Sequence, residues 1–471
     1  MNDFGAMDTA IIVAMIVTYI LFTSWLTFKL RSRTNDQFMT AARALPPVIV
    51  GFLLMSEFIG ANSTIGTSQA AFTSGIAAGW SVAGASMGFL AFGLFFVRKV
   101  YNSGEYTISA AIQQKYGTST MIAVSLIMIG ALFVVNVGNY ISGAAALGTV
   151  LKLNQPAAMA IIAVVSTYFF AFGGLKGVAY VTLLHSIIKI IGISLILGVA
   201  LTLTGGIKPM VAGLPDYYFT WDGKIGASTI IAWIVGNVGA IFSTQFIIQA
   251  ISSNRDANSA RRSTFVAAVL AIPIGIALGL IGVASHFLYP EMKSLYALPV
   301  FLQHMPTLMA GVAATALVAS VFVSVGTVAL AIASLVVRDF YEPYFKPTPE
   351  RRFAMTRLFS LVIGFAPLLC VFLVPEIIRM SFFTRAIRLS ISVVALVGFY
   401  LPLFATARGA TAGLIVSALL TSLWYALNNP FGIDNMYVAL VTPLLVMAAE
   451  WTLSRLLAPA VPATTPSQRS P

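Results

Sequence analysis

The chain has 471 residues, of which 59% are hydrophobic and only 9% are charged, and its mean hydropathy is +0.92. An average soluble domain carries about 25% charged residues, so this composition excludes a soluble globular protein and indicates one that crosses a membrane many times. The formal net charge of +12 does not indicate a nucleic-acid partner, because the basic residues are scattered over short loops between apolar runs. A single cysteine excludes an internal disulfide framework, and the three histidines lack the spacing of metal ligands.

Apolar runs of about 20 residues, the length that a helix needs to span a bilayer, recur along the whole chain. The first run lacks a small-residue cleavage site and is followed by the basic segment TFKLRSRT, so we interpret it as a retained helix rather than a signal peptide. We therefore expect an all-α polytopic membrane protein with about 13 transmembrane helices. The expected helices are 9–29, 45–70, 76–97, 119–150, 156–173, 178–204, 226–252, 263–288, 308–338, 355–374, 386–405, 409–427 and 436–456.

Most of the 27 lysines and arginines fall in alternate loops. Cytoplasmic loops carry an excess of these residues, so the pattern predicts an amino terminus outside the cell and a cytoplasmic carboxyl terminus, in the plasma (inner) membrane. The segment GEYTISAAIQQKYG is too polar to span, and we expect it to form a short interfacial helix on the inner side. We expect the Pro/Ser/Thr-rich tail, 458–471, to be disordered.

The stretch 45–75, LPPVIVGFLLMSEFIGANSTIGTSQAAFTSG, begins as an apolar helix but soon contains Glu57, Gly60, Asn62 and Ser63. Backbone groups at membrane depth can be left free only where protein or a watery cavity satisfies them. A carboxylate followed by glycine and small hydroxyl residues therefore predicts an unwound helix that lines a site.

The expected helix at 226–252 contains its own interruption, VGNVGAIFST, and lies five helices after the first interrupted one. Two broken helices in corresponding positions are typical of a transporter built from inverted repeats, with its site near the middle of the membrane. The alternative is that isolated glycines only permit close helix packing.

Four segments of the chain carry a family resemblance: ARALPPVIVGFLLMSEFIGANSTIG, AFGGLKGV, TQFIIQAISSNRDANSAR and ALVASVFVSVGTVALAIASLVVRDFY. In this order and spacing they resemble the sodium:solute symporter family. The resemblance covers nearly the whole chain and implies a leucine-transporter-type fold. It implies one transporter domain, 1–457, with an extra N-terminal helix in 1–40, inverted repeats at 41–225 and 226–405, and C-terminal helices in 406–457.

The resemblance also implies a sodium site. Backbone carbonyls would come from the broken first helix, and a carbonyl and a hydroxyl would come from the helix at 308–338, where Val323 replaces one usual hydroxyl. Three hydroxyl residues of that helix fall on one stripe, at i, i+4 and i+7. The alternative for this stripe is that each hydroxyl bonds to the carbonyl one turn earlier. The possible sodium ligands are Ser56, Ile59, Ser320, Ser324 and Thr327.

Glu57 is the main candidate for ion coupling, because an ionised carboxylate at membrane depth must be paired, hydrated, ion-bound or protonated. It could add a charge near a sodium ion, replacing an aspartate that the family has where this chain has Thr182, or it could carry a proton. His185 and Lys189, at i and i+4, are its possible cationic partners. The alternative is that the carboxyl only caps the broken helix.

Polar side chains in the expected helices are the candidate substrate contacts. Arg385 and Arg388, near the outer end of the helix at 386–405, could hold a carboxylate, because a guanidinium pairs with it through two hydrogen bonds. The alternative for both arginines is contact with lipid headgroups. The candidate contacts are Glu57, Ser63, Asn136, Tyr140, Gln245, Gln249 and Arg388.

Together these features predict a secondary active transporter that couples a small polar or carboxylated solute to a cation by alternating access. Na⁺ is the expected coupling ion, and a proton-coupled symporter or a uniporter of the same fold is the alternative. A solute-binding sensor is a further alternative, but we expect no signalling domain in this chain. The expected partners are the solute, Na⁺ or H⁺ and the lipid bilayer, with no cofactor. The sequence contains no nucleophile–base or metal motif that would indicate an enzyme.

Overall fold

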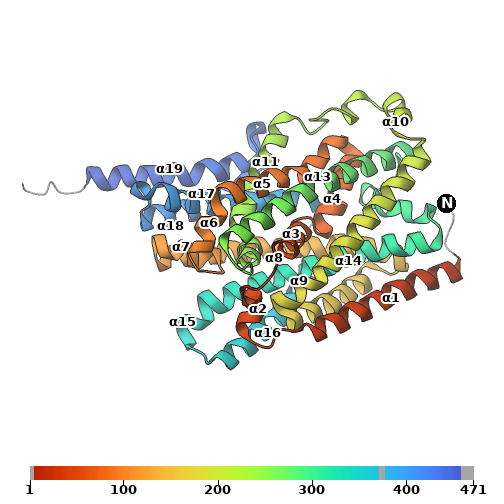
Figure 1. Ribbon diagram of the computed structural model, residues 1–471. Coiled ribbons are helices and arrows are strands. Elements are labelled where there is room, and N and C mark those ends of the chain that lie inside the picture. The colour runs from red at the N-terminus through yellow and green to blue at the C-terminus, as the bar shows by residue number, and fades with distance from the viewer. Residues whose placement is uncertain (1–4, 371–376, 458–471) are drawn as a thin grey trace, which may run out of the picture.

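In the computed structural model, which describes residues 5–370 and 377–457, the chain forms a bundle of long helices that run roughly side by side (Figure 1). The helix bounds follow from cap residues and from the lengths of the apolar runs. For example, the hydroxyls of Thr107 and Thr406 accept hydrogen bonds from the first turns of the helices that follow them. The helices are α1 (Ala6–Lys29), α2 (Asn35–Thr40), α3 (Pro47–Phe58), α4 (Ala61–Ser74), α5 (Trp80–Ala91), α6 (Val97–Asn102), α7 (Ile108–Tyr116), α8 (Thr118–Leu151), α9 (Gln155–Thr204), α10 (Ile207–Gly213), α11 (Ala227–Ser243), α12 (Gln245–Ile251), α13 (Ala257–Leu288), α14 (Thr307–Leu335), α15 (Glu342–Phe345), α16 (Pro349–Phe365), α17 (Ile377–Tyr400), α18 (Ala407–Ala426) and α19 (Asn435–Leu456).

The described residues contain 10 helices that are long and apolar enough to cross a membrane, or up to 12 if each of two bent pairs is one span. The expectation of an all-α polytopic protein is therefore confirmed. One of these helices, α9, has 50 residues, but its Gly174 leaves the helical conformation at φ 57° and ψ −169°. This glycine divides α9 where the sequence predicts the end of one helix and the start of another. The number 13 itself stays a prediction.

Both predicted helix interruptions are present. The chain bends by 50° between α3 and α4, and by 55° between α11 and α12. The polar segment after α6 forms the short helix α7, as expected, while its interfacial position stays a prediction. The end of the helix expected at 355–374 and the tail at 458–471 lie outside the described residues.

One predicted helix boundary is wrong in a way that affects the site. The sequence places a helix at 386–405, with Arg385 and Arg388 at its end, whereas α17 runs from Ile377 to Tyr400. The polar run RMSFFTRAIR makes the first turns of this helix hard to recognise in the sequence, because the polar side chains that follow Arg379 are buried by neighbouring helices. Both arginines therefore lie well inside α17, and they are only 4% and 6% exposed.

Helix α14 forms the centre of the bundle, since its most apolar stretch is entirely buried. It packs most extensively against α9 and also against α8 and α1. Small residues permit this close approach: a side chain at Gly192 of α9 would meet Ala316, and one at Gly143 of α8 would meet Val321. In Figure 1, α1 and the pair α18–α19 lie at opposite flanks of the bundle. Helices α3, α4 and α12, which flank the two breaks, also contact α14.

Candidate functional site

The break between α3 and α4 has a local cause at two residues. Ile59 leaves the helix at φ −101° and ψ 59°, and Gly60 follows in an extended conformation. Gly60 also lies against α14, because a Cβ atom there would overlap the hydroxyl group of Ser324 and lie 2.8 Å from its Cβ. The absence of a side chain at Gly60 therefore lets the broken backbone lie directly on α14.

Lys189 of α9 binds the end of α3. Its ammonium nitrogen donates to the carbonyl of Ile59 at 2.8 Å, to the hydroxyl of Ser56 at 2.9 Å and to the carbonyl of Ser56 at 3.3 Å. An ammonium group has three N–H donors, and these three acceptors match that number. Lys189 is 1% exposed, so its charge is buried at the break.

The hydroxyl stripe of α14 bonds mainly to its own helix. Ser320, Ser324 and Thr327 each donate to the carbonyl four residues earlier, at 3.1, 2.8 and 2.9 Å. This is the back-bonding that the sequence leaves open as the alternative for these residues. Of the predicted sodium ligands, Ser56 and Ile59 thus contact an ammonium group, while the three hydroxyl groups of α14 satisfy backbone carbonyls. The ammonium group of Lys189 thus contacts two of the residues that the sequence assigns to sodium, and the sodium site itself stays a prediction.

Glu57 projects toward α14, where Thr327 donates a hydrogen bond to its carboxylate. The sequence proposes Lys189 and His185 as cationic partners of Glu57, but the described residues contain no ion pair to this carboxylate within 4.0 Å. His185 instead shares a hydrogen bond with the hydroxyl of Tyr19 in α1. Lys189 donates to the backbone of Ser56 and Ile59, and Arg388 donates to Thr384 and Thr244. The expected direct pairs are therefore absent.

A pocket lies beside the break and joins both broken helices to α8, α14 and α17. Its wall contains one carboxylate, two guanidinium groups, two amides and several hydroxyl groups among apolar side chains. The lining residues are Glu57, Phe58, Gly60, Asn62, Ser63, Leu132, Val135, Asn139, Thr244, Ile247, Val328, Ser381, Arg385 and Arg388.

The two arginines of the pocket are held by neutral groups. Arg385 donates to Asn237 at 2.5 Å and to the carbonyl of Ser81 at 3.1 Å, and its guanidinium lies over the ring of Phe58. Arg388 donates to the hydroxyl of Thr244 at 2.8 Å and to the carbonyl of Thr384 at 3.0 Å. Neither has an acidic partner within 4.0 Å among the residues that the structure describes.

The predicted substrate contacts of α8 and α4 divide into two groups. Ser63 lines the pocket, although its hydroxyl also donates to the carbonyl of Phe58 at 2.9 Å. Tyr140 and Asn136 do not line it. Tyr140 donates to the carbonyl of Gly364 at 2.5 Å, and the fully buried Asn136 amide has no hydrogen-bond partner among the described residues. Both residues lie on α8, the helix that contributes Leu132, Val135 and Asn139 to the pocket, but their own side chains are outside it.

The two glutamines predicted to contact substrate also lie elsewhere. Gln245 accepts a hydrogen bond from the Ile108 backbone at 3.0 Å and donates to the carbonyl of Tyr106 at 3.1 Å. Gln249 donates to the carbonyl of Met39 at 2.8 Å. Both side chains therefore hold α12 against α2 and against the start of α7, and neither lines the pocket.

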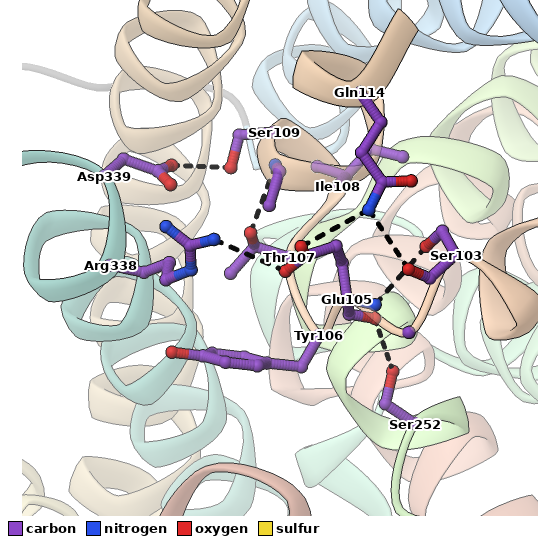
Figure 2. A network of polar contacts seen from close by, with 12 residues as sticks. Ser103, Glu105, Tyr106, Thr107, Ile108, Ser109, Gln114, Ser252, Arg338 and Asp339 are labelled. Carbon is purple, nitrogen blue, oxygen red and sulfur yellow. Dashed lines mark hydrogen bonds and ion pairs between the residues drawn. The ribbon is translucent and has the colours of Figure 1, made fainter. Parts of the chain in front are cut away.

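Figure 2 shows a polar network between the segment that precedes α7 and the helical turn Val336–Tyr341 that follows α14. Arg338 pairs with Glu105 at 3.5 Å, and Ser109 donates to the carboxylate of Asp339 at 2.5 Å. Ser252 donates to the carbonyl of Glu105 at 3.2 Å and so links α12 to the same network. This region holds helix ends together and is separate from the pocket.

Asn62, Thr244 and Ser381 are polar lining residues that the sequence did not single out as substrate contacts. One signal could have identified Ser381. It lies four residues before Arg385 and seven before Arg388, so the three form one stripe on a helix. Thr244 could have been noticed because it is the last residue of the predicted interruption VGNVGAIFST, and in the structure it lies between α11 and α12. For Asn62, only its place next to the first break pointed to a role.

Comparison with curated proteins finds transporters. High affinity choline transporter 1 of Homo sapiens is 24% identical over 377 residues, which cover 71% of this chain and 62% of the human protein. The sodium/glucose cotransporter of Vibrio parahaemolyticus is 21% identical over 373 residues, covering 72% of this chain and 68% of that protein. This chain thus spans less than two thirds of the length of the human relative.

Solved structures show the same fold. A substrate-bound, outward-open Na⁺-coupled sialic acid symporter matches with a TM-score of 0.79 at 18% identity, over 97% of this chain and 99% of the other. The nucleobase-cation-symport-1 family transporter Mhp1 matches with a TM-score of 0.63 at 15% identity, over 91% and 96%. The fold is therefore of the leucine-transporter type, as the resemblance implies. The model of the sodium:solute symporter family matches residues 38–417, the larger part of the chain, and the protein belongs to that family.

Proposed function

We propose that the protein is a secondary active transporter that couples the uptake of a small carboxylate-bearing solute to a cation gradient, with Na⁺ as the coupling ion that family membership supports. The observation that carries the solute class is the pair of buried arginines, Arg385 and Arg388, in the pocket between the two broken helices. Binding at this place fits alternating access, in which the two repeats move around a central site.

The charge of the pocket supports an anionic solute. Burial of a guanidinium group is costly unless a negative group compensates it. Glu57 is the only carboxylate that lines the pocket in the part of the chain that the structure describes, and it faces two arginines without contacting either within 4.0 Å. A solute carboxylate would supply the second negative charge and accept two hydrogen bonds from a guanidinium fork.

The arginines are also held in place before any solute binds. Arg385 lies over the rings of Phe58 and Phe382, at 4.9 and 4.4 Å from their centroids, and is bonded to Asn237. A guanidinium held between rings and an amide loses little conformational freedom on binding. This restraint supports recognition of one functional group rather than a general attraction of anions.

Uptake into reconstituted vesicles tests the proposal. A panel of labelled small carboxylates would be compared with their uncharged amides under an imposed Na⁺ gradient, and counterflow would establish transport without an ion gradient. We expect Arg388→Gln to raise KM for the carboxylate at least about tenfold and to leave the weak uptake of the amide unchanged, since charge-assisted hydrogen bonds are among the strong ones.

Arg379→Gln is the matched control, because Arg379 lies on the same helix but is exposed and bonds to Asn428 at 2.7 Å. Equal transport of the acid and the amide by the parent protein would contradict the proposed solute class. A pH gradient imposed without Na⁺ serves as a second arm, because the sequence leaves proton coupling open. Binding without transport in counterflow would favour the sensor instead.

The proposed orientation places the amino terminus outside and the carboxyl terminus in the cytoplasm. It is supported by the distribution of lysine and arginine among the loops. After replacement of Cys370, single cysteines in 205–225 are expected to react with an impermeant reagent from outside, and cysteines in 255–262 are not. The reverse pattern would overturn the orientation. We also propose inverted repeats at 41–225 and 226–405, because each of these ranges contains one of the two broken helices.

A further inference from the structure

The end of α3 is built as a cation site. At the carboxyl end of a helix the last carbonyl groups lack partners within the helix, and the helix dipole places partial negative charge there. In membrane transporters, such free carbonyls at an unwound turn coordinate the coupling cation. Here the carbonyls of Ser56 and Ile59 and the hydroxyl of Ser56 converge on one point between α3, α9 and α14.

A cation already lies at this point, and it belongs to the protein. The ammonium nitrogen of Lys189 is 2.8 to 3.3 Å from all three oxygen atoms. No acidic group lies within 4.0 Å of it in the described residues, so its charge is balanced by backbone carbonyls rather than by an ion pair. Carbonyl oxygens and a helix dipole are the surroundings that would hold a free monovalent ion.

Helix α14, which lies on the other side of this point, does not complete a sodium site. Val323 offers no oxygen from its side chain, and the hydroxyls of Ser320 and Ser324 donate to the carbonyls of Ala316 and Ser320. A hard cation such as Na⁺ prefers several oxygen ligands around it. An ammonium group needs only as many acceptors as it has N–H bonds, and it has three.

We propose that the Lys189 ammonium group is a tethered cation that takes the place of a sodium ion at the break between α3 and α4, and that it holds the break in its bent form. A free Na⁺ and this ammonium group exclude each other at the site, because both need the carbonyl of Ile59 and would repel one another. Any sodium coupling by this protein therefore uses oxygen atoms at another position. The inference rests on the proposed transport function where solute uptake or counterflow is measured, and it does not where Na⁺ binding is measured.

Chemical rescue tests the proposal. Lys189→Ala removes the charge and leaves space, whereas Lys189→Met removes the charge and fills the space. In K⁺-free buffer at the lowest Na⁺ concentration that still supports full counterflow by the parent, we expect solute counterflow by both variants to fall at least about tenfold, because charge-assisted hydrogen bonds are lost. Added Na⁺ or methylammonium is expected to restore the Ala variant and not the Met variant. Full counterflow by Lys189→Met without added cation would overturn the proposal.

Binding of ²²Na⁺ to the purified protein provides a second measurement that needs no solute. We expect Lys189→Ala to bind one more equivalent of Na⁺ than the parent, and Lys189→Met to bind the same number as the parent. Equal binding by the parent and the Ala variant would overturn the proposal. If the parent shows no counterflow of any solute, the proposed function fails, but the binding result still decides the role of Lys189.

A third variant covers the case in which both Lys189 variants misfold. Ser324→Ala removes a hydroxyl of the predicted sodium site while leaving Lys189 in place. We expect its Na⁺ binding and the Na⁺ response of its uptake to equal those of the parent. A several-fold loss of Na⁺ affinity in Ser324→Ala, with unchanged thermal stability, would show sodium at this site and would overturn the proposal.

Discussion

The two broken helices have similar bends, of 50° and 55°, but their free backbone groups are satisfied in different ways. At the first break, between α3 and α4, the carbonyls of Ser56 and Ile59 accept from the buried charge of Lys189. At the second, between α11 and α12, neutral hydroxyls do most of the bonding. Ser243 donates to carbonyls of α11 and α17, and Thr244 donates to the carbonyl of Ala240 at 2.5 Å.

This difference indicates that a similar backbone shape supports two kinds of chemistry. The first break depends on a charge supplied by a distant helix, so a change in that charge is expected to change its shape. The second break is satisfied largely by its own residues, and its Thr244 also accepts a hydrogen bond from Arg388. We therefore expect the first break to respond to changes in charge, and the second to respond to changes in the solute pocket.

The largest expected effect follows from removing the charge at the first break. Lys189→Met leaves two buried carbonyls and a hydroxyl without this donor, and a buried polar group without a partner costs about 1–3 kcal/mol. We expect the free energy of unfolding to fall by about 2–4 kcal/mol, measured by thermal unfolding in detergent. Lys208→Met, at an exposed residue of α10, is the control and is expected to change nothing. Equal stability of both variants would show that the first break does not depend on the charge of Lys189.

A side chain at Gly60 is expected to have the next largest effect. A Cβ atom there overlaps the hydroxyl of Ser324, so Gly60→Ala pushes the first break away from α14. Such overpacking costs about 1–3 kcal/mol. The second break offers a comparison, because a Cβ atom at Gly239 would overlap Leu389 and lie 3.0 Å from its Cα. Ser324→Gly should relieve the first clash, and a double variant no more stable than Gly60→Ala would contradict this reason.

A smaller effect is expected at the second break. Thr244→Val removes the acceptor of the 2.8 Å hydrogen bond from Arg388. The loss of one such bond costs about 1 kcal/mol, so we expect KM for a carboxylated solute to rise by less than in Arg388→Gln. Stability in the absence of solute is expected to change little. A Thr244→Val variant as defective as Arg388→Gln would mean that Thr244 itself contacts the solute.

The smallest expected effect concerns Glu57. Glu57→Gln keeps an oxygen that can accept from Thr327, so stability is expected to change by less than about 1 kcal/mol. The variant removes the carboxylate that Glu57 contributes to the pocket, and we expect a several-fold lower KM for a carboxylated solute, because two arginines remain. Thr327→Val serves as the control for the hydrogen bond alone. A higher KM in Glu57→Gln would indicate that this carboxylate binds a cation or the solute directly.

The sequence was sufficient for the class of protein and for most of its elements. Long apolar runs indicate membrane spans, and glycine and hydroxyl residues inside them indicate breaks, and both interpretations agree with the structure. The sequence also singled out Glu57, Ser63 and Arg388, which line one pocket. Gln245, Gln249 and Tyr140 lie outside this pocket, because a polar residue on a buried helix face can bond to a neighbouring backbone as well as to a solute. Their contact with a solute stays a prediction.

By itself the sequence determined the membrane class, the helices and the places where two of them break, because hydrophobic length and the conformational preferences of glycine act locally. Only the tertiary structure decided which side chain meets each break. Lys189 is 130 residues from Ile59 along the chain, and their contact depends on how α9 packs against α3. From the sequence, Lys189 was a possible cationic partner of Glu57. Packing brought the lysine to the backbone instead, because the open carbonyls of the broken helix needed a donor.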